Sequence, residues 1–442
     1  MHIVKFSVKK LFRLYTYTIN FTKLKNNLCI LTGPNGYGKT TVLQIIDCLS
    51  EVDLFFFYTF PFERIELQFD NKESIEINQG FLEEQEGIDA DEDTNLLSCK
   101  LHFIYKDKNK EQINYFILSY DKLYETLSFQ EKRELNEISS NSLSLKEKWR
   151  FFKNKTNNYE QIAQEQGQEQ FLFFLKRINS FFVPAQRLSF VAISENGYSY
   201  RFPKIKRQSA IDYVVEKLKE ILNKSKIDYL NNSQIHDNSF VQRFITYELK
   251  GYTELQYKKK LKQLQKRLVE LQKFNLIESF DFFPYKLQHK KILSVYVDDF
   301  EEKLDAYNEL IEKLRIFSDI LSEKSFSNKT ILFSPERGLY VQDSKGNFLD
   351  NNALSSGEQN EIIMLYHFLF DLNDDSLLLI DEPEISLHVA WQLSFLDDIE
   401  KIIKTKKIQV ILATHSPQII NNKWDNCFDF YEQTEKKHKN NL

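Results

Sequence analysis

An α/β fold built around a phosphate-binding loop is predicted by three features of the sequence. An apolar run from Leu28 to Leu31 is typical of a buried strand, and it leads into a glycine-rich loop at 33–40. An amphipathic helical pattern follows this loop, with apolar residues at 42, 45, 46 and 49. Near the other end of the chain, helical and strand patterns alternate over 351–420, as they do in an α/β core.

The glycine-rich loop has the residues that a phosphate site needs. Three of the chain's 11 glycines, at 33, 36 and 38, lie close together, which indicates a local backbone requirement. Glycines let successive N–H groups point inward, and the helix N-terminus adds partial positive charge. Lys39 is expected to reach the β- and γ-phosphates of ATP, and the Thr40 hydroxyl to coordinate Mg²⁺. The flanking strand and helix argue against a chance glycine-rich turn.

Composition limits the remaining possibilities. The net charge of −5 over 442 residues gives no overall basic surface, so any nucleic-acid contact needs a local patch. The four cysteines are widely spaced, which predicts reduced thiols rather than a metal site. The longest apolar run, Leu54 to Tyr58, is too short to span a bilayer. We therefore expect a soluble, cytoplasmic protein with no membrane contact.

Two adjacent carboxylates follow an apolar strand pattern at 376–380. They are Asp381 and Glu382, and the carboxyl edge of an open parallel sheet is where ligands bind. Asp381 is expected to hold Mg²⁺ and Glu382 to orient or deprotonate the attacking water. Two neighbouring carboxylates repel each other without a cation, so a metal–nucleotide site explains them better than a solvated turn does.

Two further motifs point to the same chemistry. The strand pattern at 410–413 delivers His415 to the same sheet edge; a lone histidine is usually structural, but this context favours a γ-phosphate contact. The hexapeptide 354–359, Leu-Ser-Ser-Gly-Glu-Gln, opens a long helix whose N-terminus suits an anion. A capping box between Ser355 and Glu358 explains these residues equally well.

Together these motifs resemble those of ABC-type ATPases. They are Gly-Pro-Asn-Gly-Tyr-Gly-Lys-Thr-Thr, Leu-Ser-Ser-Gly-Glu-Gln, Ile-Asp-Glu-Pro-Glu-Ile-Ser-Leu-His and Ala-Thr-His-Ser-Pro. A narrower resemblance is to the SMC/RecF-like and OLD-like ATPases found in anti-phage systems such as Septu and PARIS. It rests on the Glu-Ile-Ser-Leu-His ending of the third motif and on Phe-Val-Pro-Ala-Gln-Arg at 182–187. The resemblance covers about 1–50 and 350–420. It implies an ABC-type ATPase head, with a mixed sheet and an antiparallel β subdomain, and a helical insertion.

The resemblance also implies roles for single residues. The residues expected to bind ATP are Asn35, Gly36, Gly38, Lys39, Thr40, Thr41, Gln186, Ser355, Gly357 and Glu358. Those expected to act in catalysis are Lys39, Glu382 and His415, and those expected to hold Mg²⁺ are Thr40, Asp381 and Gln186. Gln186 is the candidate Q-loop glutamine, with Gln68 as a rival because the spacing departs from the usual pattern. Ser386 to His388 would form the D-loop.

Four segments are expected from these assignments. They are 1–120 with Walker A and the antiparallel β subdomain, 121–330 as the helical insertion with a return strand and possible Q-loop at 181–187, 331–425 with the signature, Walker B, D-loop and switch histidine, and 426–442 as a polar tail. Within the insertion, Tyr257, Leu261, Leu264, Leu268 and Leu271 follow a 4–3–4–3 spacing. This spacing predicts a short antiparallel hairpin or coiled-coil segment.

The family's mechanism implies a homo-oligomer, a head-to-tail dimer or a higher multiple, because the signature of one subunit closes over ATP held by another. ATP would join subunits and hydrolysis would release them, which makes a switch. The leading hypothesis is an ATP hydrolase, with slow turnover if it is a poised switch. It would be the sensor or scaffold of an anti-phage complex that controls a separate HNH or Toprim nuclease, with a phage protein or DNA as the trigger.

An alternative is a RecF/SMC-like DNA-repair ATPase that binds DNA directly, with a transporter ATPase a distant third. The sequence support for DNA binding is a basic run on one predicted helix, made of Lys258, Lys259, Lys260, Lys262, Lys266 and Arg267. Glu254 and Glu270 flank this run, and a solvated helix face is its commoner meaning.

Overall fold

The computed structural model describes residues 1–80, 96–108, 113–139, 145–152, 156–185, 191–193, 206–246, 251–324, 326, 328–385 and 387–434. The chain divides into two compact units. The first unit contains Met1–Ala185, Leu372–Ile385 and Val389–Leu442; the second contains Gln186–Asp371 and Ser386–His388. These limits differ from the segment boundaries expected from sequence, which stay a prediction.

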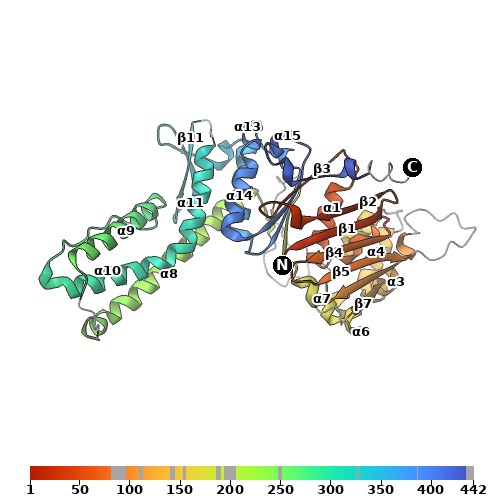
Figure 1. Ribbon diagram of the computed structural model, residues 1–442, viewed down its shortest axis with the longest axis horizontal. Helices are drawn as coiled ribbons and strands as arrows, with labels where there is room; N and C mark the ends of the chain where they lie inside the picture. Colours follow the sequence, from red (N-terminus) through yellow and green to blue (C-terminus); the bar gives the residue numbers. More distant parts are fainter. Residues whose placement is uncertain are drawn as a thin grey trace, which may run out of the picture. The chain divides into compact units, whose positions relative to one another are not determined.

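A six-stranded antiparallel sheet forms one layer of the first unit (Figure 1). In spatial order its strands are β2 (Tyr15–Asn20), β1 (Ile3–Leu11), β4 (Arg64–Phe69), β5 (Ser74–Gly80), β6 (Lys100–Lys106) and β7 (Ile113–Leu118). Side chains alternate between the two faces with period two, so that Ile65, Leu67 and Phe69 of β4 are buried. The expected antiparallel β subdomain is confirmed.

Helices and aromatic rings cover the apolar face of this sheet. The helices after β7 are α3 (Tyr120–Glu125), α4 (Phe129–Ser139), α5 (Leu145–Phe152), α6 (Thr156–Glu165) and α7 (Glu169–Lys176). Phe171 of α7 lies 5.1 Å from Phe116 of β7, and Phe174 lies 4.5 Å from Tyr105 of β6, measured between ring centroids. These contacts assign 121–185 to the first unit, although the sequence places this segment in the insertion.

A partly exposed ion pair joins the end of α7 to the residue before β5. The Arg177 guanidinium donates two hydrogen bonds of 3.0 Å to the Glu73 carboxylate, which also accepts 2.8 Å from the Tyr105 hydroxyl. The Glu73 side chain is only 5% exposed. Burial alone would raise the pKa of Glu73, but the hydrogen bonds from Arg177 and Tyr105 outweigh it and hold the pKa below its usual value of 4.5.

Replacing Arg177 with Met is expected to lower the free energy of unfolding at pH 7 by about 1–2 kcal/mol, because Glu73 keeps its charge without its main hydrogen-bond donor, while the exposure of Arg177 weakens the pair. Since the folded-state pKa is lowered, this stabilisation is present above pH 4.5 and is lost as the pH falls through the folded-state value. Urea unfolding at neutral and acid pH measures both effects. The control is Lys176→Met, which removes an exposed ion pair with Glu160; an equal cost in the two variants would contradict the account.

A five-stranded parallel sheet forms the second layer of the first unit. In spatial order its strands are β16 (Cys427–Asp429), β3 (Leu28–Thr32), β15 (Gln409–Ala413), β14 (Leu377–Asp381) and β8 (Ser180–Val183). The main helices of this part are α1 (Lys39–Ser50), α13 (Val389–Gln392), α14 (Phe395–Lys406) and α15 (Pro417–Ile420). Asp381 pairs with Ala413 and Ala413 pairs with Leu31, so the strands end at one common edge.

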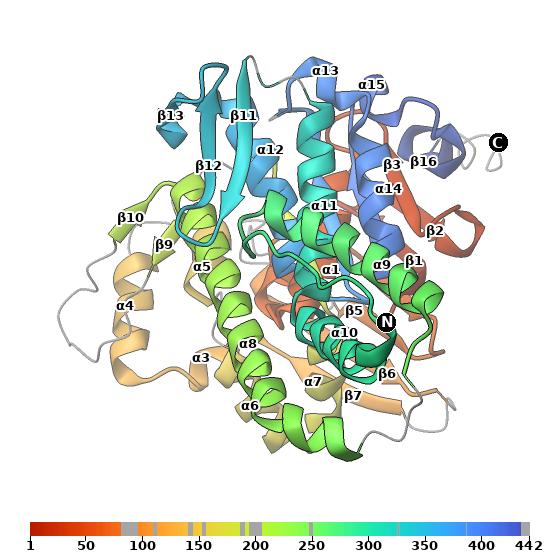
Figure 2. The same ribbon diagram turned by 90° about the vertical axis from the view of Figure 1, so that its left-hand side faces the viewer.

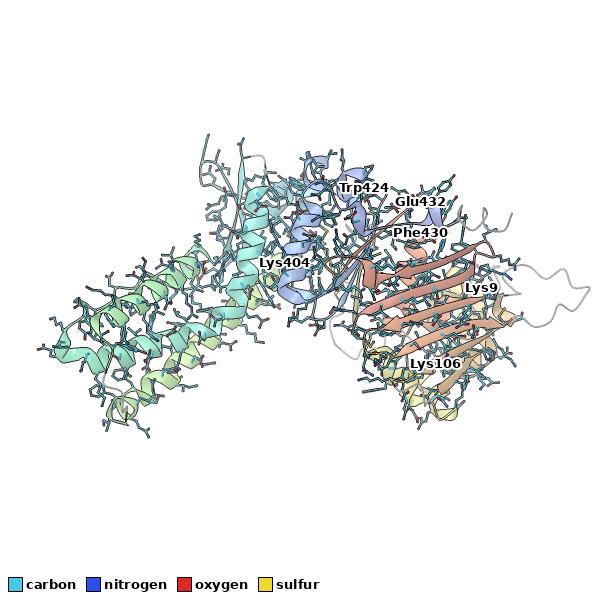
Figure 3. The ribbon with its side chains drawn as sticks, viewed as in Figure 1. Lys9, Lys106, Lys404, Trp424, Phe430 and Glu432 are labelled. Atoms are coloured by element: carbon cyan, nitrogen blue, oxygen red, sulfur yellow. The ribbon has the colours of Figure 1, made fainter. Side chains whose placement is uncertain are left out.

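The strand β16 differs from the polar tail expected from residue 426 onward. It pairs in parallel with β3, Cys427 facing Ile30 and Asp429 facing Thr32. Phe430, labelled in Figure 3, is fully buried, with its ring 4.4 Å from that of Tyr17. Burial of this aromatic ring beside the sheet offsets the polar character of the flanking residues.

Long helices make up most of the second unit (Figure 2). They are α8 (Ala210–Thr246), α9 (Glu254–Lys273), α10 (Lys290–Leu304), α11 (Asn308–Glu323) and α12 (Ser356–Tyr366), and α12 continues as a π-helical turn at His367–Asp371. The strands are the short pair β9 (Val191–Ile193) and β10 (Lys206–Gln208), and the sheet β11 (Lys329–Ser334), β12 (Gly338–Asp343) and β13 (Phe348–Leu349). The predicted α/β class with a helical insertion is confirmed.

The helices of the insertion pair in both directions, α8 antiparallel to α10 and α9 parallel to α10. Tyr257, Leu264, Leu268 and Leu271 of α9 are buried, as their spacing predicts. Lys260 bonds to Asp298 at 2.7 Å and Arg267 to Asp305 at 3.0 Å, so α9 and α10 run parallel rather than antiparallel. Residues 274–289 connect α9 to α10 and run back along α9, where the Tyr257 hydroxyl donates a hydrogen bond to the Phe283 carbonyl.

No helix in the described part of the chain could cross a membrane.

Candidate nucleotide site

The glycine-rich loop joins β3 to α1 in the first unit. Gly33, Gly36 and Gly38 all have positive φ, in the region that favours glycine. At Gly38 a Cβ would also lie 2.7 Å from Leu11 Cδ2, so the loop sits close under the β1–β2 hairpin. Asn35 and Gly36 are exposed at the tip of the loop, whereas Thr40 and Thr41 are partly exposed in the first turn of α1. The loop is thus open to a ligand on the side of its tip.

The ammonium group of Lys39 points back into this loop. The side chain is 5% exposed, and Nζ donates to the carbonyls of Gly33 (2.9 Å) and Pro34 (3.2 Å). Nζ also lies 2.6 Å from His415 Nε2. Burial lowers the pKa of Lys39, and the nearby carboxylates of Glu382 and Asp381 partly offset that effect. An anionic phosphate beside Nζ would favour the charged form in the same way.

Thr40 and Asp381 bring hard oxygen ligands together at the sheet edge. The Thr40 hydroxyl lies 3.0 Å from both carboxylate oxygens of Asp381, which is 6% exposed. In the described ranges no three His, Cys, Asp or Glu residues form a metal site on their own. Mg²⁺ commonly takes only one or two protein oxygens, with water and substrate phosphates completing its shell. This oxygen pair therefore fits Mg²⁺ bound together with a nucleotide.

Glu382 and His415 face each other across the ends of β14 and β15. The Glu382 backbone has φ of +41°, and its N–H donates 2.9 Å to the Ala413 carbonyl. Glu382 Oε1 lies 3.8 Å from His415 Nε2. A left-handed φ at a residue other than glycine costs energy and occurs most often at functional sites. The turn thus directs this carboxylate toward the imidazole beside Lys39.

The three signature residues lie in the second unit. The Ser355 hydroxyl accepts from the Glu358 N–H (3.3 Å), and the Glu358 carboxylate accepts from the Ser355 N–H (2.6 Å) and from Lys329 Nζ (2.8 Å). Burial alone would raise the pKa of Glu358, but Lys329 and Ser355 hold it below 4.5. The capping box considered from sequence is therefore present. Contact of Ser355, Gly357 and Glu358 with a nucleotide stays a prediction.

The remaining candidates from the sequence are two glutamines, one D-loop serine and the basic run. Gln186 and Ser386 lie outside the described residues, so the Q-loop assignment stays a prediction. The rival Gln68 donates a hydrogen bond of 2.7 Å to Glu66 on the same strand.

In the basic run, Lys258, Lys260 and Arg267 are ion-paired with Glu254, Asp298 and Asp305 respectively. This pairing neutralises half of the run that supports the DNA-binding alternative.

Two carboxylates near the site were not singled out from the sequence. Asp429 accepts a hydrogen bond of 3.3 Å from the Thr32 hydroxyl, next to the start of the glycine-rich loop. Glu384 accepts hydrogen bonds from the turn that holds His415. Glu384 could have been found from the sequence, because it is the fourth residue of the Asp-Glu-Pro-Glu motif. Asp429 could not, because its strand of three residues is too short to produce a recognisable pattern.

Comparison with known proteins identifies the family. Residues 1–420 match the family AAA_15, described as an AAA ATPase domain, whereas no curated protein matches the chain. Similar solved structures include three Smc head domains: one bound to the C-winged helix domain of ScpA, one from Pyrococcus furiosus with an extended coiled coil bound to the C-terminal domain of ScpA, and one from Pyrococcus yayanosii with a coiled coil and joint. Each is 14% identical over 95% of this chain and 91%, 91% and 93% of theirs, with TM-scores of 0.32, 0.33 and 0.29. Scores this low add nothing to the sequence match.

Proposed function

The chain belongs to the AAA ATPase domain family, and from this premise we propose that it binds ATP with Mg²⁺ and hydrolyses it in the first unit. The observation that carries the proposal is the meeting of Lys39, Glu382 and His415 beside the glycine-rich loop. The loop supplies backbone N–H groups, Lys39 a positive charge, and Glu382 a carboxylate within reach of the same space. These are the groups that phosphoryl transfer to water requires.

Each residue has a definite part in the proposed reaction. Lys39 exchanges its bonds to the Gly33 and Pro34 carbonyls for bonds to the β- and γ-phosphates. Thr40 and Asp381 would hold Mg²⁺, which when bound would neutralise charge that develops on the phosphates. Glu382 accepts the proton of the attacking water, and His415 donates a hydrogen bond to the γ-phosphate. Phosphate release by the purified full chain with ATP and Mg²⁺ tests this function; a rate no higher than that of Lys39→Ala would contradict it.

The signature residues extend the proposal to a pair of subunits. Ser355 and Gly357 lie at the N-terminus of α12, whose unsatisfied N–H groups and dipole suit an anion. The motif resemblance supports placing this end against ATP held by another copy of the chain. Binding of ATP would then join subunits head to tail, and hydrolysis would separate them. The working unit is a dimer or a multiple of dimers.

The substitution Gly357→Ala, which adds one methyl group, distinguishes a role of Gly357 in ATP hydrolysis from a purely structural role. Gly357 lies in α12 without a positive φ, and a Cβ there would be 3.8 Å from its nearest neighbour, the His388 nitrogen. Gly357→Ala is therefore expected to keep or raise the thermal midpoint, since alanine favours helix by about 0.5–1 kcal/mol. ATP hydrolysis is expected to fall about tenfold, because the methyl group obstructs the approach of the phosphate. Unchanged hydrolysis would remove Gly357 from the site.

The resemblance to ATPases of anti-phage systems supports the biological part of the proposal. The protein acts in the cytoplasm as the sensor or scaffold of a defence complex, and it holds a separate HNH or Toprim nuclease inactive until a phage protein or DNA arrives. The test is to express the gene with its native neighbours and weigh the tagged complexes by native mass spectrometry, with and without ATP. A stoichiometric nuclease partner is expected. An ATP-dependent dimer that retains DNA and no partner would contradict this role.

A further inference from the structure

Glu384 holds the turn that carries His415. After Glu382 the chain makes one 3-10 turn, Pro383–Ile385, and the Glu384 side chain reaches the end of the neighbouring strand β15. Its Oε2 accepts 2.8 Å from the Thr414 hydroxyl, and its Oε1 accepts 2.7 Å from the His415 backbone N–H. One carboxylate therefore fixes two consecutive residues of the other strand's turn.

A closed circuit of hydrogen bonds completes this arrangement. The Thr414 hydroxyl accepts 3.0 Å from the Ser416 N–H, and the Ser416 hydroxyl donates 2.9 Å to Gln392 Oε1. Gln392 returns a bond of 3.3 Å from its side-chain amide to the Glu384 carbonyl. Thr414 is fully buried and Gln392 is 7% exposed, so solvent competes little for these groups. The circuit links both ends of the turn to Glu384.

The backbone N–H of His415 belongs to this circuit, and its imidazole reaches the groups beside the glycine-rich loop. Its Nε2 is 2.6 Å from Lys39 Nζ and 3.8 Å from Glu382 Oε1. Because His415 is attached to the backbone that Glu384 holds, a shift of the turn would move the imidazole away from both groups. We propose that Glu384 is a positioning residue for ATP hydrolysis, which acts by fixing the place of His415. This inference rests on the proposed function and adds a residue that acts through the backbone of His415.

The circuit needs the acceptor capacity of a carboxylate. Both donors, the Thr414 hydroxyl and the His415 N–H, point at oxygens of Glu384. A glutamine offers one oxygen and an NH₂ group, so it can accept only one of the two bonds in the present geometry. An alanine offers none and leaves both donors without their partner. The two substitutions therefore form a graded series.

The test is a double-mutant cycle on the full chain between Glu384 and His415. Glu384→Ala is expected to lower kcat by about a hundredfold, the size of effect that follows from an ångström of misplacement. The Kd for ATP, measured by titration calorimetry, is expected to stay within about threefold, because Glu382 and Asp381, which act on Lys39 more strongly than Glu384 does, are unchanged. Glu384→Gln is expected to retain an intermediate kcat. In a His415→Ala background, Glu384→Ala is expected to have no further effect on kcat.

The outcomes separate this inference from its alternatives. If Glu384→Ala lowers kcat by the same factor with and without His415, its effect is structural and the inference is overturned. If Glu384→Ala weakens ATP binding as much as it slows turnover, the inference is also overturned. If His415→Ala alone hydrolyses ATP like the wild type, the proposed role of His415 in the reaction fails first. A thermal midpoint for each variant shows that it is folded, and Glu384→Gln replaces Glu384→Ala if the latter is not.

Discussion

Replacement of Glu382 by glutamine is expected to slow ATP hydrolysis by about a thousandfold, within the range of a lost general base. Glutamine has the same shape and can adopt the same turn, whose backbone N–H remains bonded to the Ala413 carbonyl. It cannot take a proton from water, and it removes one of the charges facing Lys39. ATP is therefore expected to bind at least as tightly and to persist in the complex. Single-turnover phosphate release and native mass spectrometry measure the two effects.

The matched control for this variant is Glu160→Gln, a surface glutamate whose ion pair with Lys176 is exposed. It is expected to hydrolyse ATP at the wild-type rate. A Glu382→Gln variant that turns over ATP as fast as this control would show that another group activates the water. A variant that loses ATP binding instead would show that the Glu382 carboxylate holds the nucleotide rather than acting on water.

Replacement of Lys39 by alanine is expected to weaken ATP binding by on the order of a hundredfold, about 3 kcal/mol, because it removes a buried positive charge facing the phosphates. Without nucleotide, the free energy of unfolding is expected to stay the same or rise. Burial disfavours the charged ammonium of Lys39 and lowers its pKa, and alanine removes this desolvation cost. Titration calorimetry with ATP and urea unfolding without it test the two parts.

Lys404→Ala provides the control for a lost positive charge. Lys404 is exposed on α14 and labelled in Figure 3, and its replacement is expected to leave both quantities unchanged. If Lys39→Ala binds ATP as this control does, the glycine-rich loop is not the phosphate site. If it unfolds more easily than this control without nucleotide, Lys39 has a structural role through its bonds to Gly33 and Pro34.

Sequence reasoning was reliable where a strand pattern ends in a chemically distinct residue. The apolar runs before Lys39, Asp381 and His415 each predicted a buried strand, and the common edge of a parallel sheet predicted that these residues meet. Lys39 Nζ lies 2.6 Å from His415 Nε2, and Thr40, the residue after Lys39, donates a hydrogen bond of 3.0 Å to Asp381. The antiparallel sheet was also predictable, because strands such as β4 and β5 alternate fully buried and partly buried residues over six or more positions.

The parts that escaped sequence reasoning depend on tertiary contacts. Strand β16 has three residues, too few for a period, and is stabilised by burial of Phe430 against Tyr17. The parallel course of α9 and α10 depends on the return segment 274–289, whose path no heptad pattern records. The contacts of Glu384 with Thr414 join residues thirty positions apart. The spacing of residues along the chain does not predict a hydrogen bond of this kind.

The most direct test of the central claim, that one ATP site is built from two copies of the chain, mixes two inactive variants. Lys39→Ala lacks the phosphate-binding lysine, and Gly357→Arg places a long side chain at the N-terminus of α12. In a random mixture half of the dimers are mixed, and each of these has one intact site, so about a quarter of wild-type hydrolysis is expected. If the mixture is no more active than the two variants measured separately, hydrolysis does not take place between subunits.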